Sequence, residues 1–339
     1  MQAPFFVGAH QARAVQPPVK LMMVFKRKAV RMKQPSLALE LRAAGVNQAQ
    51  RSPLVFVGLA GTLLLILIAI IFGTFSAIND GNVTNLRYAL LGGTAGFAAT
   101  TLGACLALVL KDIPAKRQDS MLGFAAGMML AASAFSLILP GVEAGETILG
   151  SRLAGAAVVV MGLGLGVLLM LGLDHFIPHE HEITGAQGPV FERISRVWLF
   201  VLAITLHNIP EGMAIGVGFA TGDLSVGVPL ATAISIQDIP EGLAVALALR
   251  SIGLSAGKAV LVAALSGFME PLGALIGVGM SSAFALAYPV SMGLAAGAMI
   301  FVVSHEVIPE THRNGHQTPA TIGLMVGFAV MMFLDTALG

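Results

Sequence analysis

The sequence has almost no cysteine and little charge. Cys105 is the one cysteine among 339 residues, which excludes an intrachain disulfide, a cysteine-based zinc site and a cysteine redox pair. Charged residues make up only 11% of the chain, against 56% hydrophobic residues and a mean hydropathy of +0.85. This balance is typical of a polytopic membrane protein in a lipid bilayer. The net charge of +1 comes with no basic–aromatic pattern, so nucleic acid is not an expected partner.

The basic residues are concentrated at the N-terminus, where residues 1–52 carry nine of the nineteen lysines and arginines. We expect this segment to be disordered and cytoplasmic, because it is basic and poor in apolar runs. A cleaved signal peptide fits badly, since the basic region is long and no A-x-A-like site follows the apolar run at 54–72. Residues 53–80 are expected to form one additional transmembrane helix, and 84–339 an eight-helix core.

Nine apolar runs, each about twenty residues long, could cross a bilayer as helices. They are roughly 54–78, 86–110, 119–140, 153–173, 197–220, 226–249, 257–280, 284–308 and 319–338. The expected fold class is therefore an all-α polytopic membrane protein. With the N-terminus in the cytoplasm most lysines and arginines fall at cytoplasmic helix ends, and the odd number of spans then puts the C-terminus outside.

Two matched polar motifs interrupt neighbouring apolar runs, HNIPEG at 207–212 and QDIPEG at 237–242. At about 100° per residue, the first, second and fifth positions of each motif share one helix face, so the two polar faces are expected to meet across one seam. Ionisable residues at membrane depth are costly, so a functional role is the first interpretation. A kinked helix whose glutamate is buried in protonated form is the alternative.

The proline of each motif favours a cation pocket. Pro210 cannot donate to the carbonyl of Leu206, nor Pro240 to that of Ile236, so each helix bends beside a carboxylate. The two spans run in opposite directions and carry matched motifs, which relates them as an inverted pair. Transporters commonly place their site near mid-membrane between such repeats.

A third glutamate, Glu270, lies directly before a proline inside a later span. Together with Glu211, Asp238 and Glu241 it brings four potential negative charges, while no lysine or arginine lies deep in any span. Protons could neutralise the four groups, and so could two divalent cations. His207 favours Zn²⁺ and similar ions over Mg²⁺ or Ca²⁺, which prefer oxygen ligands alone.

HNIPEGMAIG together with QDIPEGLAVALAL resembles the paired signature of the ZIP family of divalent-metal transporters, specifically its bacterial members. The resemblance covers the eight spans from about 84 to 339. It implies an eight-helix core arranged as a three-two-three inverted repeat, with a two-metal site between the two motif helices. The 54–78 span and the basic leader lie outside this pattern, and many members differ from this chain at Gln237 or Asp238.

The resemblance also implies a ligand set. His207 and Glu211 would bind one metal, with Met129 as an additional ligand, although a methionine in a membrane helix is more often packing. Glu211 and Glu241 would lie between both ions. The second metal would be served by Asn208, Gln237, Asp238 and Glu270.

Two further groups of histidine and glutamate lie at cytoplasmic ends. The first, DHFIPHEHE, contains His175, His179, Glu180, His181 and Glu182; the second, SHEVIPETHRNGH, contains His305, Glu306, Glu310, His312 and His316. Clustered imidazole and carboxylate groups hold divalent metals weakly in water, so we expect metal exit relays. A solvated polar loop is the alternative.

The sequence predicts a transporter that moves Zn²⁺ into the cytoplasm, with Cd²⁺, Fe²⁺ or Mn²⁺ as other cargo. The alternative is a membrane-embedded dinuclear metalloenzyme of the hydrolase type. No HExxH motif, nucleophile elbow or docking domain supports the enzyme. The expected location is the bacterial cytoplasmic (inner) membrane. A homodimer is compatible with the sequence, and so are both proton-coupled and facilitated transport.

Overall fold

The computed structural model describes residues 46, 49–79, 83–110, 113–176, 179–181, 185–187, 196–251, 254–312 and 314–338. Side chains are described within these ranges except at 70, 72–79, 176, 179–181, 185–187, 196–204, 206–207 and 251. The predictions for residues 1–45 therefore lie outside the described residues.

The described chain is a series of apolar helices. They are α2 (Pro53–Asn79), α3 (Val83–Leu106), α4 (Ala115–Ala131), the π-helix η2 (Ala132–Ile138), α5 (Leu139–Leu149), α6 (Arg152–Phe176), α7 (Arg196–Gly218), α8 (Leu224–Ser251), α9 (Ala256–Ser266), α10 (Met269–Ser281), α11 (Ala287–Val302), the π-helix η3 (Val303–Val307), α12 (Ile308–His312) and α13 (Gln317–Leu338). Each of the nine predicted runs coincides with one of these helices or with two or three consecutive ones.

Seven of the described helical segments are long and apolar enough to cross a membrane. The predicted all-α polytopic membrane fold is thus confirmed. A short antiparallel hairpin was not predicted: β1 (His179–His181) pairs with β2 (Gly185–Gln187), and His179 lies opposite Gln187.

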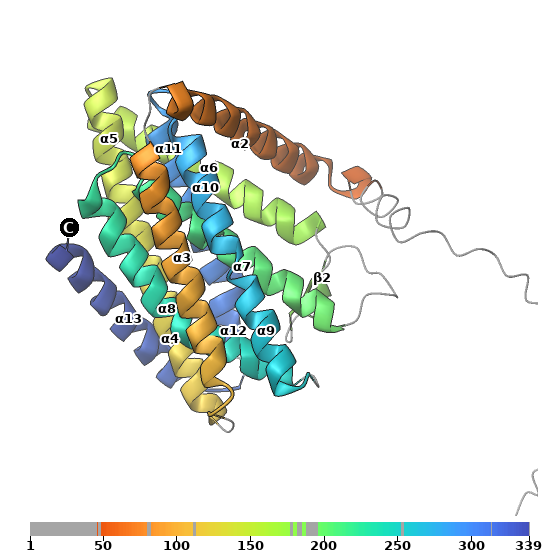
Figure 1. The fold of residues 1–339 in the computed structure, drawn as a ribbon. Helices are drawn as coiled ribbons and strands as arrows, with labels where there is room; N and C mark the ends of the chain where they lie inside the picture. The colour runs from red at the N-terminus through yellow and green to blue at the C-terminus, as the bar shows by residue number, and fades with distance from the viewer. Residues whose placement is uncertain are drawn as a thin grey trace, which may run out of the picture.

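The helices pack in pairs (Figure 1): α4 lies against α13, α6 against α11, α3 against α8, and α7 against α10. Glycines allow close approach in each of these four pairs, and the contacts are reciprocal. A Cβ at Gly127 of α4 would collide with a backbone carbonyl of α13, and one at Gly327 of α13 with a carbonyl of α4. Gly166 of α6 and Gly297 of α11 are related in the same way. Small residues are the usual means by which helices approach closely in lipid.

Two of the long helices contain a π-helical segment, η2 between α4 and α5 and η3 between α11 and α12. A proline follows each segment within a few residues, Pro140 in the first case and Pro309 in the second. Such wider turns shift the register of the helix that follows and are frequent near functional sites.

Helix α2 runs along the edge of the bundle, against α6 and α10 (Figure 1). Leu59 packs where Gly172 of α6 leaves space, because a Cβ there would lie 2.6 Å from the Leu59 side chain. Ser52 Oγ lies 2.8 Å from His175 Nε2, which connects the start of α2 to the end of α6. Leu64 and Leu67 on α2 are exposed, as expected for a helix that faces lipid.

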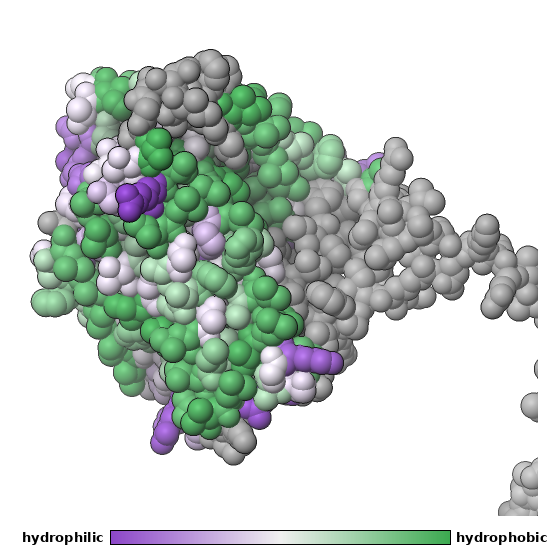
Figure 2. All heavy atoms as spheres, viewed as in Figure 1, coloured by the Kyte–Doolittle hydropathy of each residue, from purple (hydrophilic) through white to green (hydrophobic). Residues whose placement is uncertain are grey.

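The outer surface is apolar around the middle of the bundle. Figure 2 shows hydrophobic residues over most of the visible face, with hydrophilic ones towards the ends. Leu91, Leu102, Leu261 and Ile322 are among the exposed large hydrophobic side chains. An apolar surface of this extent is suited to a hydrocarbon surrounding.

Candidate metal-ion site

The two motif helices are neighbours, and each contains its proline within the helix, Pro210 in α7 and Pro240 in α8. Three carboxylates converge where the motifs meet. Glu211, Asp238 and Glu241 each place an oxygen within 4.8 Å of the others. They form the one group of three or more such side chains that could hold a metal ion among the described residues. The predicted approach of the two motif faces is therefore present in the structure.

Glu270 joins this cluster from the first turn of α10. Its side chain is completely buried, and Thr100 on α3 donates a 2.7 Å hydrogen bond to its Oε1 atom. Glu270 lies within electrostatic reach of Glu211 and Glu241. Four acidic side chains from α7, α8 and α10 thus share one region of the bundle.

Amide side chains line the same region. Gln237 is fully buried and donates from Nε2 to Glu211 Oε1 at 2.8 Å. Six buried polar side-chain atoms lack a hydrogen-bond partner among the described residues, and four of the six belong here: Asn208 Nδ2, Gln237 Oε1, Asp238 Oδ2 and Glu270 Oε2. Buried polar atoms without partners are costly, and three of these four are oxygens that a cation would satisfy.

Lysine or arginine side chains do not take the place of such a cation in the described residues. Among the described residues no buried side chain is a lysine or arginine. Carboxylates buried together repel one another strongly in a low-dielectric surrounding unless protons or metal ions neutralise them. The donor set of carboxylate and amide oxygens therefore fits a divalent cation as cargo.

Comparison with known proteins decides the family. A model of the family described as ZIP zinc transporter matches residues 178–335. Zinc transporter ZIPB of Bordetella bronchiseptica is 69% identical over 309 residues, which cover 91% of this chain and 100% of that protein. The chain belongs to the ZIP family.

Two more distant ZIP relatives extend the comparison. Zinc transporter GufA of Myxococcus xanthus is 42% identical over 250 residues, covering 74% of this chain and 97% of that protein. Zinc transporter ZIP11 of Homo sapiens is 31% identical with the same two shares of coverage. Membership confirms the family resemblance and the transport of metal ions. ZIP proteins are transporters rather than enzymes, so the metalloenzyme alternative loses its support.

For two predicted ligands of the ZIP site, the structure describes no contact with the carboxylate cluster. His207 is one helical turn before Glu211 on α7, but its side chain is outside the described residues. Met129 on α4 is 1% exposed and belongs to the apolar core, so packing accounts for its burial. The ligand roles of both residues stay predictions.

The described histidine side chains of the predicted exit relay each contact other groups. His305 Nε2 lies 3.8 Å from Asp174 Oδ2, and the His305 ring stacks on Phe301 with a centroid separation of 5.0 Å. His175 is the partner of Ser52 described above. His179, Glu180 and His181 form β1, but their side chains, and all of Glu182, lie outside the described residues.

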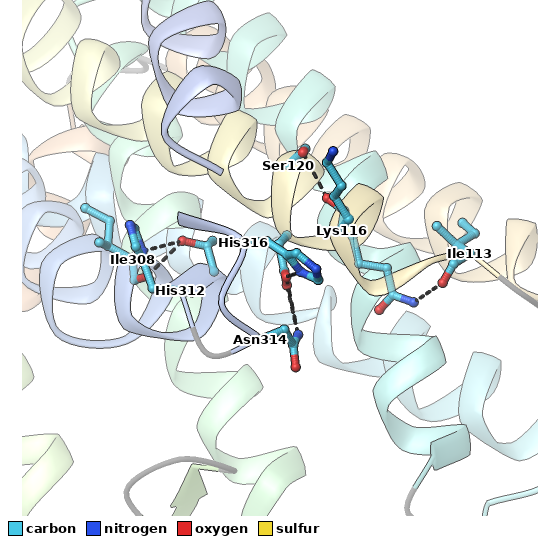
Figure 3. Close-up of polar contacts among 10 residues, drawn as sticks. Ile113, Lys116, Ser120, Ile308, His312, Asn314 and His316 are labelled. Atoms are coloured by element: carbon cyan, nitrogen blue, oxygen red, sulfur yellow. Dashed lines mark hydrogen bonds and ion pairs between the residues drawn. The ribbon is translucent and has the colours of Figure 1, made fainter. Parts of the chain in front are cut away.

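The C-terminal part of the second group lies around the turn from α12 to α13 (Figure 3). His316 Nδ1 is 2.7 Å from Asp119 Oδ2 on α4, and Asn314 Nδ2 donates to both oxygens of the same carboxylate at 3.2 and 3.3 Å. His312 Nδ1 lies 2.7 Å from the carbonyl of Ile308. Glu306 is 7% exposed and Glu310 is half-buried.

Among the described residues these side chains do not assemble into a second group with metal-ligand spacing. The exit relay stays a prediction. Sequence reasoning missed three residues that lie against predicted site residues. Thr100 and Gly96 lie against Glu270, and Asp119 lies against His316. For Asp119 a signal was present, because it is an acidic residue at the very start of an apolar run.

Proposed function

We propose that this ZIP protein carries Zn²⁺ into the cytoplasm through a two-ion site between α7 and α8. The observation that carries the proposal is the convergence of Glu211, Asp238 and Glu241, whose oxygens lie within 4.8 Å of one another in the interior of the bundle. Glu211 and Glu241 occupy equivalent places in the two motifs, so both ions share them.

The charge balance supports two ions. With Glu270 the site holds four carboxylates, and two divalent cations carry the four positive charges that would neutralise them. His207 and Met129 complete the first position, while Asn208, Gln237, Asp238 and Glu270 serve the second. A position with imidazole nitrogen favours Zn²⁺ or Cd²⁺, and the oxygen-rich second position also accommodates Fe²⁺ and Mn²⁺.

The helix pairs support an inverted repeat. The proposed repeat relates α3 to α9–α10, α4–α5 to α11–α12, α6 to α13, and α7 to α8. Under this relation the pair α4–α13 corresponds to α11–α6, and the pair α3–α8 corresponds to α10–α7. All four pairs are present. The π-helices η2 and η3 lie in two helices that the repeat relates to each other, α4–α5 and α11–α12. The reciprocal glycine contacts of the pair α4–α13 likewise correspond to those of the pair α6–α11. Alternating access around a central site follows from such an arrangement.

The proposed orientation places the N-terminus in the cytoplasm and the C-terminus outside the cytoplasmic membrane. The test is uptake of Zn²⁺ into proteoliposomes that contain the purified full-length protein, with bound metal counted in parallel. Accumulation with two ions per chain supports the proposal. A folded protein that takes up no Zn²⁺ and binds no metal contradicts the proposal. Recording internal pH in the same assay separates proton coupling from facilitated flow.

A further inference from the structure

Helix α3 contributes to the metal site although neither motif lies on it. It packs against α8 and α10, which carry Asp238 and Glu270. Gly96 and Thr100 are four residues apart and therefore share one helix face. Both are buried, Thr100 at 6% exposure.

The Thr100 hydroxyl is directed in an unusual way for a membrane helix. A threonine inside an apolar helix commonly donates back to the carbonyl four residues earlier, as Thr94 does to Leu90 at 2.6 Å. Thr100 instead donates across the helix interface to Glu270 Oε1 at 2.7 Å. A hydrogen bond to a carboxylate is stronger than one between neutral groups, so it fixes the orientation of the Glu270 side chain.

The other oxygen of Glu270 faces Gly96. A Cβ at Gly96 would collide with Glu270 Oε2 and lie 3.1 Å from Asp238 Oδ2. Both oxygens are buried and accept no hydrogen bond from another group among the described residues, and the two carboxyl groups interact with each other. Two buried carboxylate oxygens thus project towards the same small volume, which stays open because residue 96 has no side chain.

We propose that Thr100 and Gly96 are positioning residues for the second ion. The Thr100 hydroxyl donates to Glu270 Oε1 and leaves Glu270 Oε2 for the ion. Gly96 leaves the space into which Glu270 Oε2 and Asp238 Oδ2 project. This inference rests on the proposed two-ion site and assigns α3 to its second position. The Thr100 hydroxyl is directed at Glu270, and the space at Gly96 at Glu270 and Asp238, which are proposed as ligands of the second ion alone, so we expect the first position to bind its ion independently of them.

The experiment is a titration of the purified, metal-free full-length protein with Cd²⁺, with bound ions counted per chain. Thr100→Val removes the hydroxyl at nearly constant volume and lowers the affinity for the second ion about tenfold or more, since a charged hydrogen bond is lost. The first ion binds as in the wild type. Thr100→Ser keeps the hydroxyl and restores the second ion.

Thr101→Val is the matched control. Thr101 is adjacent on the same helix, and its Oγ1 atom has no hydrogen-bond partner among the described residues. This variant binds both ions with wild-type affinity. Gly96→Ala fills the space at Glu270 Oε2 and loses the second ion; if that variant does not fold, the Thr100 pair decides.

Equal binding of both ions by the wild type and Thr100→Val overturns the inference, as does equal impairment of Thr100→Val and Thr100→Ser. These outcomes leave the two-ion function intact. A wild-type protein that binds only one ion overturns the proposed function instead, and the inference falls with it.

Discussion

At the scale of single residues, the site contains carboxylates of two kinds. Glu211 and Glu241 come from equivalent motif positions and are proposed to touch both ions. Asp238 and Glu270 are proposed to touch only the second ion, where Thr100 and Gly96 orient them. Because these carboxylates are buried together and repel one another, we expect the loss of each kind to have a different consequence.

We expect Glu211→Ala and Glu241→Ala to lose both ions and to reduce transport to background, because each removes a shared ligand and a neutralising charge. Asp238→Ala and Glu270→Ala keep the first ion and part of the transport, with a preference shifted towards Zn²⁺ and Cd²⁺. The measurement is uptake and bound-metal stoichiometry at matched expression. If Asp238→Ala abolishes transport while Glu211→Ala retains it, the assignment of which ligands the two ions share is wrong.

The ligands must be deprotonated to bind metal, so protons compete with the ion. We expect the affinity at the central site to weaken as pH falls from about 7 to about 5, the range in which imidazole and carboxylate groups ordinarily take up protons. Metal titrations at a series of pH values check this. Affinity that stays flat across the window contradicts a site that contains His207.

The sequence predicted the main acidic residues because each carries a local signal. Motif spacing predicted that Glu211 and Glu241 share a seam, and the proline after Glu270 pointed to the same cluster. Thr100 and Gly96 carry no such signal. Thr100 meets Glu270 across 170 residues of sequence, and a threonine or glycine in an apolar helix is ordinary packing without that partner.

At the scale of elements, the predicted boundaries follow the length of the apolar runs. The segment from Ala115 to Leu149 is longer than the predicted 119–140 because η2 continues α4 into α5 without a loop. The predicted span 257–280 is divided into α9 and α10, which places Glu270 in the first turn of α10. Periodicity alone reveals neither a π-helical turn nor such a break.

A triple variant in which serine replaces His175, His179 and His181 tests the proposed relay between α6 and α7. We expect a lower transport rate with both central ions still bound, because the loop is proposed to pass metal onward rather than to form the site. Uptake rate and bound-metal count are the two readouts. Loss of both ions in this variant would mean that the site is misplaced.

The α4–α13 contact depends on glycine. Gly127→Ala puts a methyl group against the Leu324 carbonyl, with the Phe328 nitrogen at 2.8 Å, and overpacking of this kind costs about 1–3 kcal/mol. We expect a lower midpoint of thermal unfolding in detergent. Gly164→Ala on α6 is the matched control, because nothing lies within 4 Å of a Cβ there. Equal midpoints for both variants would show that the contact is not close in solution.

At the scale of the whole molecule, the four helix pairs fit the proposed inverted repeat. α7 and α8 exchange with each other, so the carboxylates they carry lie at the centre of the proposed symmetry. The order of apolar runs and the matched motifs predicted the relation between α7 and α8. They could not predict which of the outer helices pack together, because those pairs depend on glycine contacts between distant parts of the chain.

The most direct test of the two-ion site is a crystal structure of the Cd²⁺-loaded protein with anomalous diffraction recorded for cadmium. The account predicts two peaks between α7 and α8, each within bonding distance of Glu211 and Glu241, with the second also bonded to Asp238 and Glu270. A single peak, or peaks outside this seam, would contradict it.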